Sequence, residues 1–417
     1  VRKHTVELCR DLETEDFVVQ PHWFVSPPKW HLGHTTWFFD RFCLQKLLGK
    51  KPYREDFDWV FNSYYESQGA RVAQSERGTL SRPTVREVMD YRAAVDEQIE
   101  EASTWLANES PETRASWASA VELGRHHEQQ HQELLVMDIK HILYHQPARP
   151  ALGGLTEPML MATPCPAPIR SAGARARGTA GGRSAIPEYP LENPFELSSD
   201  ALNNHFWIDV GSGVHRIGYA GTGFAFDNER PEHHVYLEPY RIAERLVTNG
   251  EYLEFMNDGG YHRPELWLSD GWRWVTENKV MAPMYWFEQH GQWLQYRLNG
   301  SLPPDPSAAV SHVSFYEASA FAAWAGARLP TEAEWETASR HFGQPSLWQW
   351  TQSSYGPYPG FKAFSGDLSE YNGKFMCNQQ VLRGGCWATP AGHYRPTYRN
   401  FFSPEMRWQF SGIRLAN

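Results

Sequence analysis

The sequence predicts two domains, an N-terminal helical bundle followed by a C-terminal α+β domain. The chain of 417 residues, 41% hydrophobic and 21% charged, can bury a substantial core, and its length fits two domains. Apolar residues recur at helical spacing up to about residue 145, whereas short strand-like runs separated by turns follow residue 205. We therefore assign residues 1–146 to the bundle, 147–204 to a Pro-, Ala- and Gly-rich linker or insertion, and 205–417 to the second domain.

Three or four helices are expected in the bundle. The first begins after Ser26-Pro27-Pro28, where a capping residue precedes proline at the helix start, and apolar residues then recur at helical spacing through Trp37. Further helices are expected over about Pro83–Leu106 and about Trp117–Tyr144. A bundle of this kind can carry a metal ion in its core.

The second domain is expected to alternate short strands with a few capped helices. Strand-like runs occupy Phe206–Val210 and His234–Leu237. Capping boxes, each with a hydroxyl at the N-cap and a carboxylate three residues later, are Thr248 with Glu251, Ser314 with Glu317, and Thr331 with Glu334. The Ala-, Gly- and Arg-rich stretch Ser171–Ser184 has too few apolar residues to order itself, so we expect it to be flexible.

Charge and composition exclude several classes of partner. The formal net charge is -10, whereas a nucleic-acid or anionic-membrane partner demands a clustered Lys/Arg surface. No apolar run approaches the roughly 20 residues that span a bilayer, and the first residues lack the pattern of a signal peptide. The five cysteines are an odd number without a C-x-x-C pair. We expect reduced thiols in a cytoplasmic protein that acts on small molecules, with no nucleic-acid or membrane partner.

Histidines at helical spacing predict a metal site in the bundle. His127 and His131 lie four residues apart within the last expected helix, so both side chains share one face. A third ligand, His34 or His31, can come from the first helix when the bundle brings the two helices together. Three neutral imidazoles occupy one face of an octahedral ferrous ion and leave three adjacent positions open, whereas a tetrahedral zinc ion would keep one.

Two parts of the chain resemble a known enzyme family. The segment SPPKWHLGHTTWF from Ser26, together with the H-x-x-x-H-x-E run from His127, resembles the DinB-like domain of the ergothioneine-biosynthesis sulfoxide synthases. The C-terminal half is similar to the formylglycine-generating-enzyme or sulfatase-modifying-factor fold, a C-type-lectin-like fold. The motifs that carry this second resemblance are VTNGEY from Val247, ARLPTEAEWE from Ala327, LRGG from Leu382 and FSGIRL from Phe410. The combination in this order is specific to the iron-dependent sulfoxide synthases.

The resemblance implies a DinB-like four-helix bundle, an Fe2+ cofactor and a reaction that uses dioxygen to join a thiol to hercynine, N-α-trimethylhistidine. The family's iron ligands fall on His34, His127 and His131, whereas Glu133 matches the motif without being expected to bind metal. With free L-cysteine as the thiol, the product is hercynyl-cysteine sulfoxide, a step in ergothioneine biosynthesis.

A phenol near the iron is expected to steer the reaction towards carbon–sulfur bond formation by donating a proton or an electron. The pair Tyr64-Tyr65 resembles the tyrosine pair of the cysteine-using branch of the family and is the first choice. The alternative for this pair is aromatic packing between the domains. Tyr355 and Tyr358 are second candidates, because they lie near the position where other branches keep their active-site tyrosine.

One C-terminal segment is implied to bind the betaine substrate. YRNFFSP, from Tyr398, resembles the family's betaine-binding segment, which makes Asn400 and Phe401 candidates for the trimethylammonium pocket. Aromatic faces attract quaternary ammonium groups. Gln130, beside His131, is expected to add a polar contact.

The thiol donor is expected to be free cysteine. Several relatives that accept γ-glutamylcysteine have an acidic residue where this chain has Phe402, and one of their two thiol-binding arginines aligns with Gln74. A glutamyl group would therefore lose polar partners. Arg77 and Arg82 are expected to hold the cysteine carboxylate, with solvation at the surface as the alternative for either. γ-Glutamylcysteine as donor, and selenium insertion at the same iron site, stay open.

Other functions explain less of the sequence. A formylglycine-generating activity would need a closely spaced pair of reactive cysteines, and Cys377 and Cys386 do not form that pattern. A zinc-dependent thiol transferase would be indifferent to oxygen. A lectin-like binding module would leave the three histidines unexplained.

Overall fold

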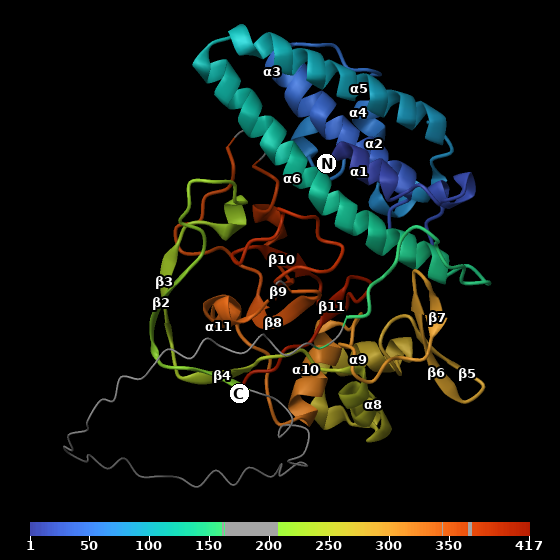
Figure 1. Cartoon of the computed structure of the whole chain (residues 1–417), viewed down its shortest axis with the longest axis vertical. Coiled ribbons are helices and arrows are strands. Elements are labelled where there is room, and N and C mark those ends of the chain that lie inside the picture. Colours follow the sequence, from blue (N-terminus) through green and yellow to red (C-terminus); the bar gives the residue numbers. More distant parts are fainter. Residues whose placement is uncertain (161, 163–206, 344, 366–368) are drawn as a thin grey trace, which may run out of the picture.

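The N-terminal half of the chain is helical and contacts the C-terminal half along one long helix, α6 (Figure 1). The computed structural model describes residues 1–160, 162, 207–343, 345–365 and 369–417. The stretch Ser171–Ser184, expected to be flexible, lies outside these residues. The α-helices of this half are α1 (Arg2–Glu7), α2 (Pro28–Phe38), α3 (Lys46–Leu48), α4 (Phe57–Val60), α5 (Val85–Trp105) and α6 (Pro111–Tyr144). Shorter 3-10 or π-helical segments are η1 (Thr14–Val18), η2 (Phe39–Gln45), η3 (Glu66–Gln68), η4 (Gln74–Thr79) and η5 (Leu106–Asn108).

Helix α2 is the central element of the bundle, because every one of its residues is buried. Pro28 occupies its first turn, where the missing N–H costs nothing. The predicted cap at Ser26 is wrong: Pro27 is the N-cap residue and makes no side-chain capping bond. Ser26 instead forms hydrogen bonds with two buried charged groups: its N–H donates to Asp138 Oδ2 at 2.8 Å, and its hydroxyl accepts from Arg77 at 2.8 Å.

The other two long helices begin at capping residues. Thr84 caps α5 and forms a capping box with Glu87, which confirms the helix expected in this region. Helix α6 starts several residues before the predicted position, because the Ser110 hydroxyl accepts from the Thr113 N–H and Pro111 fills the first helical position. At 34 residues it is about 50 Å long, and it can therefore meet both halves of the protein.

Within the described residues, the C-terminal half contains four small sheets and several short helices. The strands are β1 (Trp207–Val210), β2 (Gly213–Ile217), β3 (His233–Leu237), β4 (Tyr240–Ala243), β5 (Trp286–Gln289), β6 (Gln292–Arg297), β7 (Gly300–Leu302), β8 (Trp348–Ser354), β9 (Gln380–Arg383), β10 (Arg399–Phe402) and β11 (Ser411–Gly412). The α-helices are α8 (Asn249–Asn257), α9 (Ser269–Asn278), α10 (Phe315–Trp324) and α11 (Glu332–Ala338). The predicted strand runs are confirmed as β1 and β3, and the three predicted capping boxes begin α8, α10 and α11.

The largest sheet has the strand order β10-β9-β8-β11. Strand β9 is antiparallel to both β8 and β10, whereas β11 pairs in parallel with β8. Strand β10 is at the edge, and its Asn400 and Phe401 lie opposite Leu382 and Val381 of β9. This edge is the part of the sheet that contributes residues to the cavity described below.

One contiguous hydrophobic core joins the two halves. It includes Trp37 from the bundle and Trp348 from the largest sheet. Hydrogen bonds from indole groups to carboxylates of α6 reinforce this contact: Trp348 donates to Glu133 at 2.5 Å and Trp408 donates to Asp138 at 3.0 Å. The predicted fold class, a helical bundle followed by a mixed α+β domain with small sheets, is confirmed.

A buried ion pair ties the segment after α6 to the same helix. The ammonium group of Lys140, which is fully buried, lies 2.8 Å from Glu157 Oε1 and 2.8 Å from His312 Nε2. The Leu152 N–H also donates to the Leu298 carbonyl at 2.7 Å. The described first part of the expected linker therefore packs against the C-terminal half.

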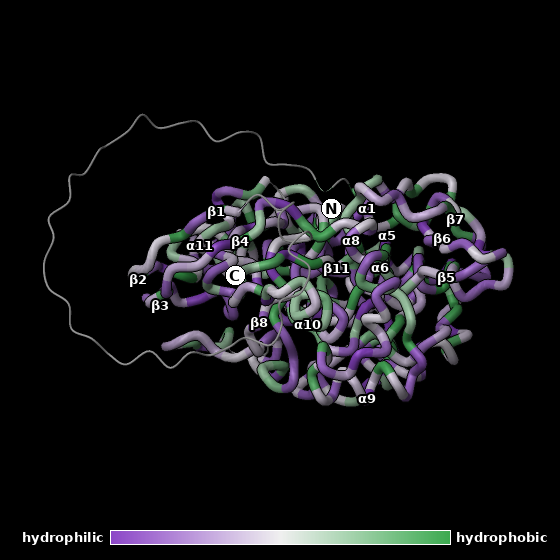
Figure 2. Tube along the Cα trace, turned by 90° about the horizontal axis from the view of Figure 1, so that it is seen from below, coloured by the Kyte–Doolittle hydropathy of each residue, from purple (hydrophilic) through white to green (hydrophobic). Residues whose placement is uncertain are grey.

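Hydrophobic and hydrophilic residues are interspersed along the coloured part of the trace, which is the part that the structure describes (Figure 2). Among the described residues, no helix combines the length and the apolar character that a membrane crossing requires. The apolar side chains instead supply the shared core.

Gly33 allows α2 to pack closely against Phe61. A Cβ atom at position 33 would lie 2.1 Å from the Phe61 ring, and that ring is itself buried. We expect Gly33→Ala to lower the free energy of unfolding by about 1–3 kcal/mol, the usual cost of overpacking a core. Chemical denaturation measures this loss. Gly211→Ala is the control because its Cβ meets nothing within 4 Å; equal stability of the two variants would contradict the packing described.

Candidate metal centre and substrate cavity

Three buried histidines meet between α2 and α6. His34 is 0% exposed, His127 2% and His131 8%, and each offers a ring nitrogen within 4.8 Å of the others. The ring centroids are 4.7–4.9 Å apart, and His34 Nε2 lies 3.2 Å from His127 Nε2. The structure thus brings together the three residues predicted as a set. We refer to them as the triad.

Hydrogen bonds fix which ring nitrogen is free in two members of the triad, His34 and His131. His34 Nδ1 donates to the Phe61 carbonyl at 2.7 Å, which leaves Nε2 as its unprotonated nitrogen. His31 Nε2 lies 2.9 Å from Asp138 Oδ2 and donates to it, so His31 Nδ1 accepts from His131 Nδ1 at 2.9 Å. His31 therefore orients His131 from behind, an arrangement that is general among metal-binding histidines.

The protonation state of the triad suits metal binding. Burial lowers the pKa of His127 to about 3 and holds the pKa values of His34 and His131 well below the ordinary value for histidine. All three rings are neutral at pH 7, which is the form that coordinates metal. Three converging neutral imidazoles fit a divalent transition metal such as Fe2+, Co2+ or Zn2+ and fit poorly to Mg2+ or Ca2+, which prefer oxygen ligands.

A cavity of about 350 Å³ lies beside the triad, with walls from α6, β10 and the loops around them. This volume falls within the range of about 300–1,000 Å³ that is usual for small-molecule sites. Its walls include His127 and His131 as well as many aromatic rings. The aromatic rings are those of Trp23, Phe24, Trp30, Tyr64, Phe226, Tyr371, Phe375, Tyr398, Phe401, Phe402 and Trp408.

Comparison with known proteins matches the two halves of the chain to two different families. A model of the DinB superfamily matches residues 1–135, and a model of the sulfatase-modifying factor enzyme 1-like domain matches residues 203–346 and 345–417. Hercynine oxygenase of Mycolicibacterium smegmatis is 29% identical to this chain over 94% of this chain and 91% of that protein. The chain belongs to the hercynine oxygenase family. The family predicted from the motifs is confirmed.

Two further relatives define the extent of the likeness. Hercynine oxygenase of Mycolicibacterium thermoresistibile is 33% identical over 48% of this chain and 55% of that protein. The formylglycine-generating enzyme of Streptomyces coelicolor is 34% identical, but over 29% of this chain and 42% of that protein. The hercynine oxygenase of Mycolicibacterium smegmatis, in contrast, matches across both regions.

Six of the predicted substrate and catalytic residues line the cavity: Tyr64, Arg77, Gln130, Asn400, Phe401 and Phe402. Gln74 also lines it, and the amide group of its side chain donates to the Phe24 carbonyl at 2.8 Å. Phe402 packs against Trp408, with ring centroids 5.0 Å apart. This part of the wall is therefore apolar.

The two members of the tyrosine pair differ in position. Tyr64 is partly buried and lines the cavity, whereas Tyr65 is fully buried behind it, with the two rings stacked at 4.8 Å. Burial raises the pKa of both phenols, so both keep their protons at neutral pH. Tyr355 and Tyr358, the second candidates, are not among the described residues that line the cavity. The Tyr355 hydroxyl accepts a hydrogen bond from Asn228 at 2.9 Å, and Tyr358 lies against Glu332.

The two predicted arginines, Arg77 and Arg82, also differ in position. Arg77 is 6% exposed and lines the cavity, where its guanidinium lies 3.3 Å from the centre of the Trp30 ring. It donates to the hydroxyls of Ser26 and Ser63, and burial lowers its pKa to about 9, so it stays charged at pH 7. Arg82 is exposed and donates to the Ser81 carbonyl, so the structure does not bring it to the cavity.

Sequence reasoning missed Tyr371 and Tyr398, which hold Gln130 in place. The Tyr371 hydroxyl donates to Gln130 Oε1 at 2.6 Å, and Gln130 Nε2 donates to the Tyr398 hydroxyl at 2.7 Å. Tyr371 lies in an irregular loop, where no periodic pattern marks a residue as inward-facing. Tyr398 stood at the start of the betaine-binding resemblance and could have been found there.

Replacing any triad histidine should abolish tight metal binding, because two imidazoles remain. We expect His34→Ala, His127→Ala and His131→Ala to contain no iron after anaerobic loading and gel filtration, as measured by metal analysis. His31→Gln should weaken binding by about 10- to 100-fold, since it removes the partner that orients His131. His393→Ala changes another buried histidine of the cavity and should bind like the parent chain. Full iron content in any triad variant would refute the assignment.

Proposed function

We propose that this chain is an iron(II)- and dioxygen-dependent sulfoxide synthase that joins L-cysteine to hercynine, giving hercynyl-cysteine sulfoxide. The observation that carries the proposal is the buried triad of neutral imidazoles at the wall of a cavity lined by aromatic rings. Family membership supports hercynine as the substrate, because the relative that matches over nearly the full chain is a hercynine oxygenase.

The reaction balances without a further reductant. The thiol loses its S–H hydrogen and the imidazole ring loses its C–H hydrogen as the carbon–sulfur bond forms. One oxygen atom of dioxygen is added to sulfur, and the other leaves as water with these two hydrogens. His34, His127 and His131 would hold the ferrous ion, which supplies the redox chemistry with dioxygen and binds the sulfur as thiolate.

The cavity offers separate partners for the groups of hercynine. Aromatic faces, Phe401 among them, surround the space and suit a trimethylammonium group, which gains about 0.5–2 kcal/mol over each favourable ring face. Gln130 is held on both sides by the Tyr371 and Tyr398 hydroxyls, so its amide is oriented before substrate arrives. Asn400 adds a second amide from β10. We assign these residues to the betaine.

Free cysteine fits the cavity better than γ-glutamylcysteine. Two guanidinium groups are among its lining residues, and that of Arg399 is already paired with Glu332 at 2.9 Å. Within the described part of the chain, the Arg77 guanidinium donates to serine hydroxyls and forms no ion pair with a carboxylate, so it can bind the cysteine carboxylate. A glutamyl group would add a second carboxylate and an ammonium group beside Phe402 and Gln74, neither of which carries a charge. The burial of such unpaired charges is costly.

Tyr64 is our candidate for the proton donor. Tyr64 belongs to the cavity wall, and the raised pKa of its phenol keeps the proton in place until oxygen is reduced. Tyr65 supports the ring of Tyr64 from behind through stacking. A proton delivered from Tyr64 Oη favours formation of the carbon–sulfur bond over oxidation of cysteine alone to its sulfinic acid.

The thiol donor can be identified by direct comparison. The iron-loaded chain is mixed anaerobically with hercynine and either cysteine, γ-glutamylcysteine or a selenosugar, opened to air, and the products are read by mass spectrometry. We expect kcat/KM for cysteine to exceed that for γ-glutamylcysteine by about tenfold or more, a difference of about 1.4 kcal/mol. Phe402→Asp combined with Gln74→Arg should lower the ratio of the kcat/KM for cysteine to that for γ-glutamylcysteine. A preference for either alternative donor would overturn the choice of cysteine, and no product from any donor would overturn the function.

Tyr64→Phe should change the product ratio more than the affinity for substrate. The substitution removes one hydroxyl and keeps the ring, so packing survives, while cysteine sulfinic acid rises at the expense of the sulfoxide. Product analysis by mass spectrometry measures the ratio. Tyr65→Phe is the matched comparison, because it removes the neighbouring hydroxyl behind the cavity wall. If both variants keep the parent ratio and rate, the pair acts through packing and Tyr371→Phe becomes the next variant to test.

A further inference from the structure

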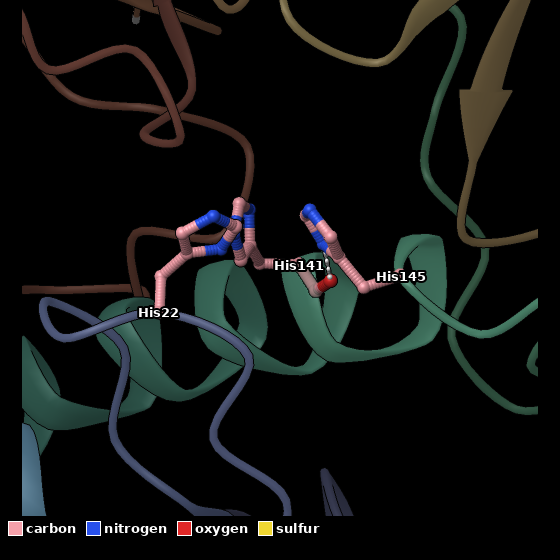
Figure 3. A group of neighbouring side chains, drawn as sticks. All are labelled: His22, His141 and His145. Atoms are coloured by element: carbon pink, nitrogen blue, oxygen red, sulfur yellow. Dashed lines mark hydrogen bonds between the residues drawn. The ribbon is translucent and has the colours of Figure 1, made fainter.

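A second group of three histidines lies near the C-terminal end of α6. His141 and His145 are four residues apart on this helix, and His22 comes from the loop between η1 and α2. Figure 3 shows their rings on the same side of the helix, with His22 reaching in from the loop. Each ring offers a nitrogen within 4.8 Å of the other two. His141 lies ten residues beyond His131, about 15 Å further along the helix axis.

The spacing of these rings matches that of the triad. Their centroids are 4.3 Å (His141–His145), 4.8 Å (His22–His145) and 5.0 Å (His22–His141) apart, against 4.7–4.9 Å in the triad. His22 Nδ1 lies 2.9 Å from His141 Nε2. Two nitrogens on a tetrahedral zinc ion are about 3.3 Å apart, given Zn–N bonds of about 2.0–2.1 Å. The His22 and His141 nitrogens therefore need to move apart by only about 0.4 Å for the cluster to accept an ion.

Hydrogen bonds orient two of the rings as they do in the triad. His145 Nδ1 donates to the His141 carbonyl at 2.8 Å, so its Nε2 is the unprotonated nitrogen. His141 Nδ1 lies 3.0 Å from the Tyr285 hydroxyl, which leaves His141 Nε2 facing His22. In metal-binding histidines, the ring nitrogen that does not bind the metal usually forms a hydrogen bond, which fixes the orientation of the ring.

The surroundings of this cluster differ from those of the triad. His22 and His145 are exposed, and none of the three histidines is among the residues that line the substrate cavity. Water can therefore reach the cluster from the protein surface and supply a fourth ligand. Three imidazoles and one water are a tetrahedral set that suits Zn2+.

We propose that His22, His141 and His145 bind a second divalent metal ion of the zinc class, independently of the triad. The ion ties the loop before α2 to the end of α6. Phe24, in the same loop, packs against the His22 and His141 rings at 5.5 Å and 5.3 Å and also forms part of the cavity wall. The second metal thus holds one wall of the substrate cavity in place without contacting the substrate.

The stoichiometry of zinc binding tests the proposal. The full chain is stripped with a chelator, dialysed against a slight excess of Zn2+ and analysed for bound metal. We expect His22→Ala combined with His145→Ala to bind one zinc ion fewer per chain than the parent. Both residues are exposed, so the variant should fold normally. His234→Ala combined with His262→Ala, which changes two exposed histidines outside both clusters, should match the parent.

A second background separates the two sites. The chain with His127→Ala and His131→Ala, which disables the triad, should still bind one zinc ion, and zinc should raise its unfolding midpoint by mass action. Adding His22→Ala and His145→Ala to this background should remove both the bound zinc and the rise. The proposal is overturned if the parent and the His22/His145 variant bind equal amounts of zinc. It is also overturned if zinc binding and the rise in midpoint persist after all four substitutions.

Discussion

Helix α6 carries polar side chains that are buried on opposite faces, and each needs a partner because an unpaired buried polar group costs about 1–3 kcal/mol. On the bundle side, Glu128 is fully buried and pairs with Arg92. On the other side, Glu133 accepts from Trp348 and Lys140 pairs with Glu157. These requirements hold the two halves in one relative position. The cavity between them depends on that position, since its walls come from both.

The same constraint explains how the triad is kept ready for metal. The neutral imidazole of His34 is held by the carbonyl of Phe61, and that of His131 by the series from Asp138 through His31. Asp138 also accepts from the Ser26 N–H and the Trp408 indole, so its carboxylate is fixed from three directions. Rings that are oriented before a metal arrives need little reorganisation to bind it.

The part of the site that lies on regular helices could be predicted from the sequence, because helical spacing alone places His127 and His131 on one face. Helical spacing could not decide between His31 and His34, since both lie on α2 and the structural difference between them rests on a carboxylate more than 100 residues away; the family resemblance supplied the choice of His34. Arg77 and Arg82 lie only five residues apart, so their positions in the sequence offer no reason to prefer one of them. Arg77 lies within the 3-10 turn η4, whereas Arg82 follows it, and only Arg77 reaches the cavity. Tyr371 lies in an irregular loop, where side-chain direction depends on tertiary contacts and leaves no periodic signal.

The fold likewise has features that local sequence predicts and features that depend on residues distant in the chain. Capping boxes mark the starts of α8, α10 and α11 because they are local hydrogen-bonding patterns that tertiary contacts leave intact. Ser26 failed as a cap because Asp138 and Arg77, both distant in sequence, compete for its polar groups. Pairing among short strands likewise depends on contacts between remote segments, as the parallel pairing of β11 with β8 illustrates.

Strand β10 lies at the edge of its sheet and is hydrogen-bonded to β9 alone. An edge strand has one neighbour to satisfy, and only the first residue of β10, Arg399, is buried and tied by an ion pair to Glu332. The side chains of the three residues that follow can therefore be exchanged at lower cost to the rest of the sheet. The triad, in contrast, is fixed by helices that cross the core of the bundle. Over evolutionary time, descendants of this protein could therefore acquire new substrates by substitutions in three residues of one strand, Asn400, Phe401 and Phe402, while the chemistry they inherit at the metal stays the same.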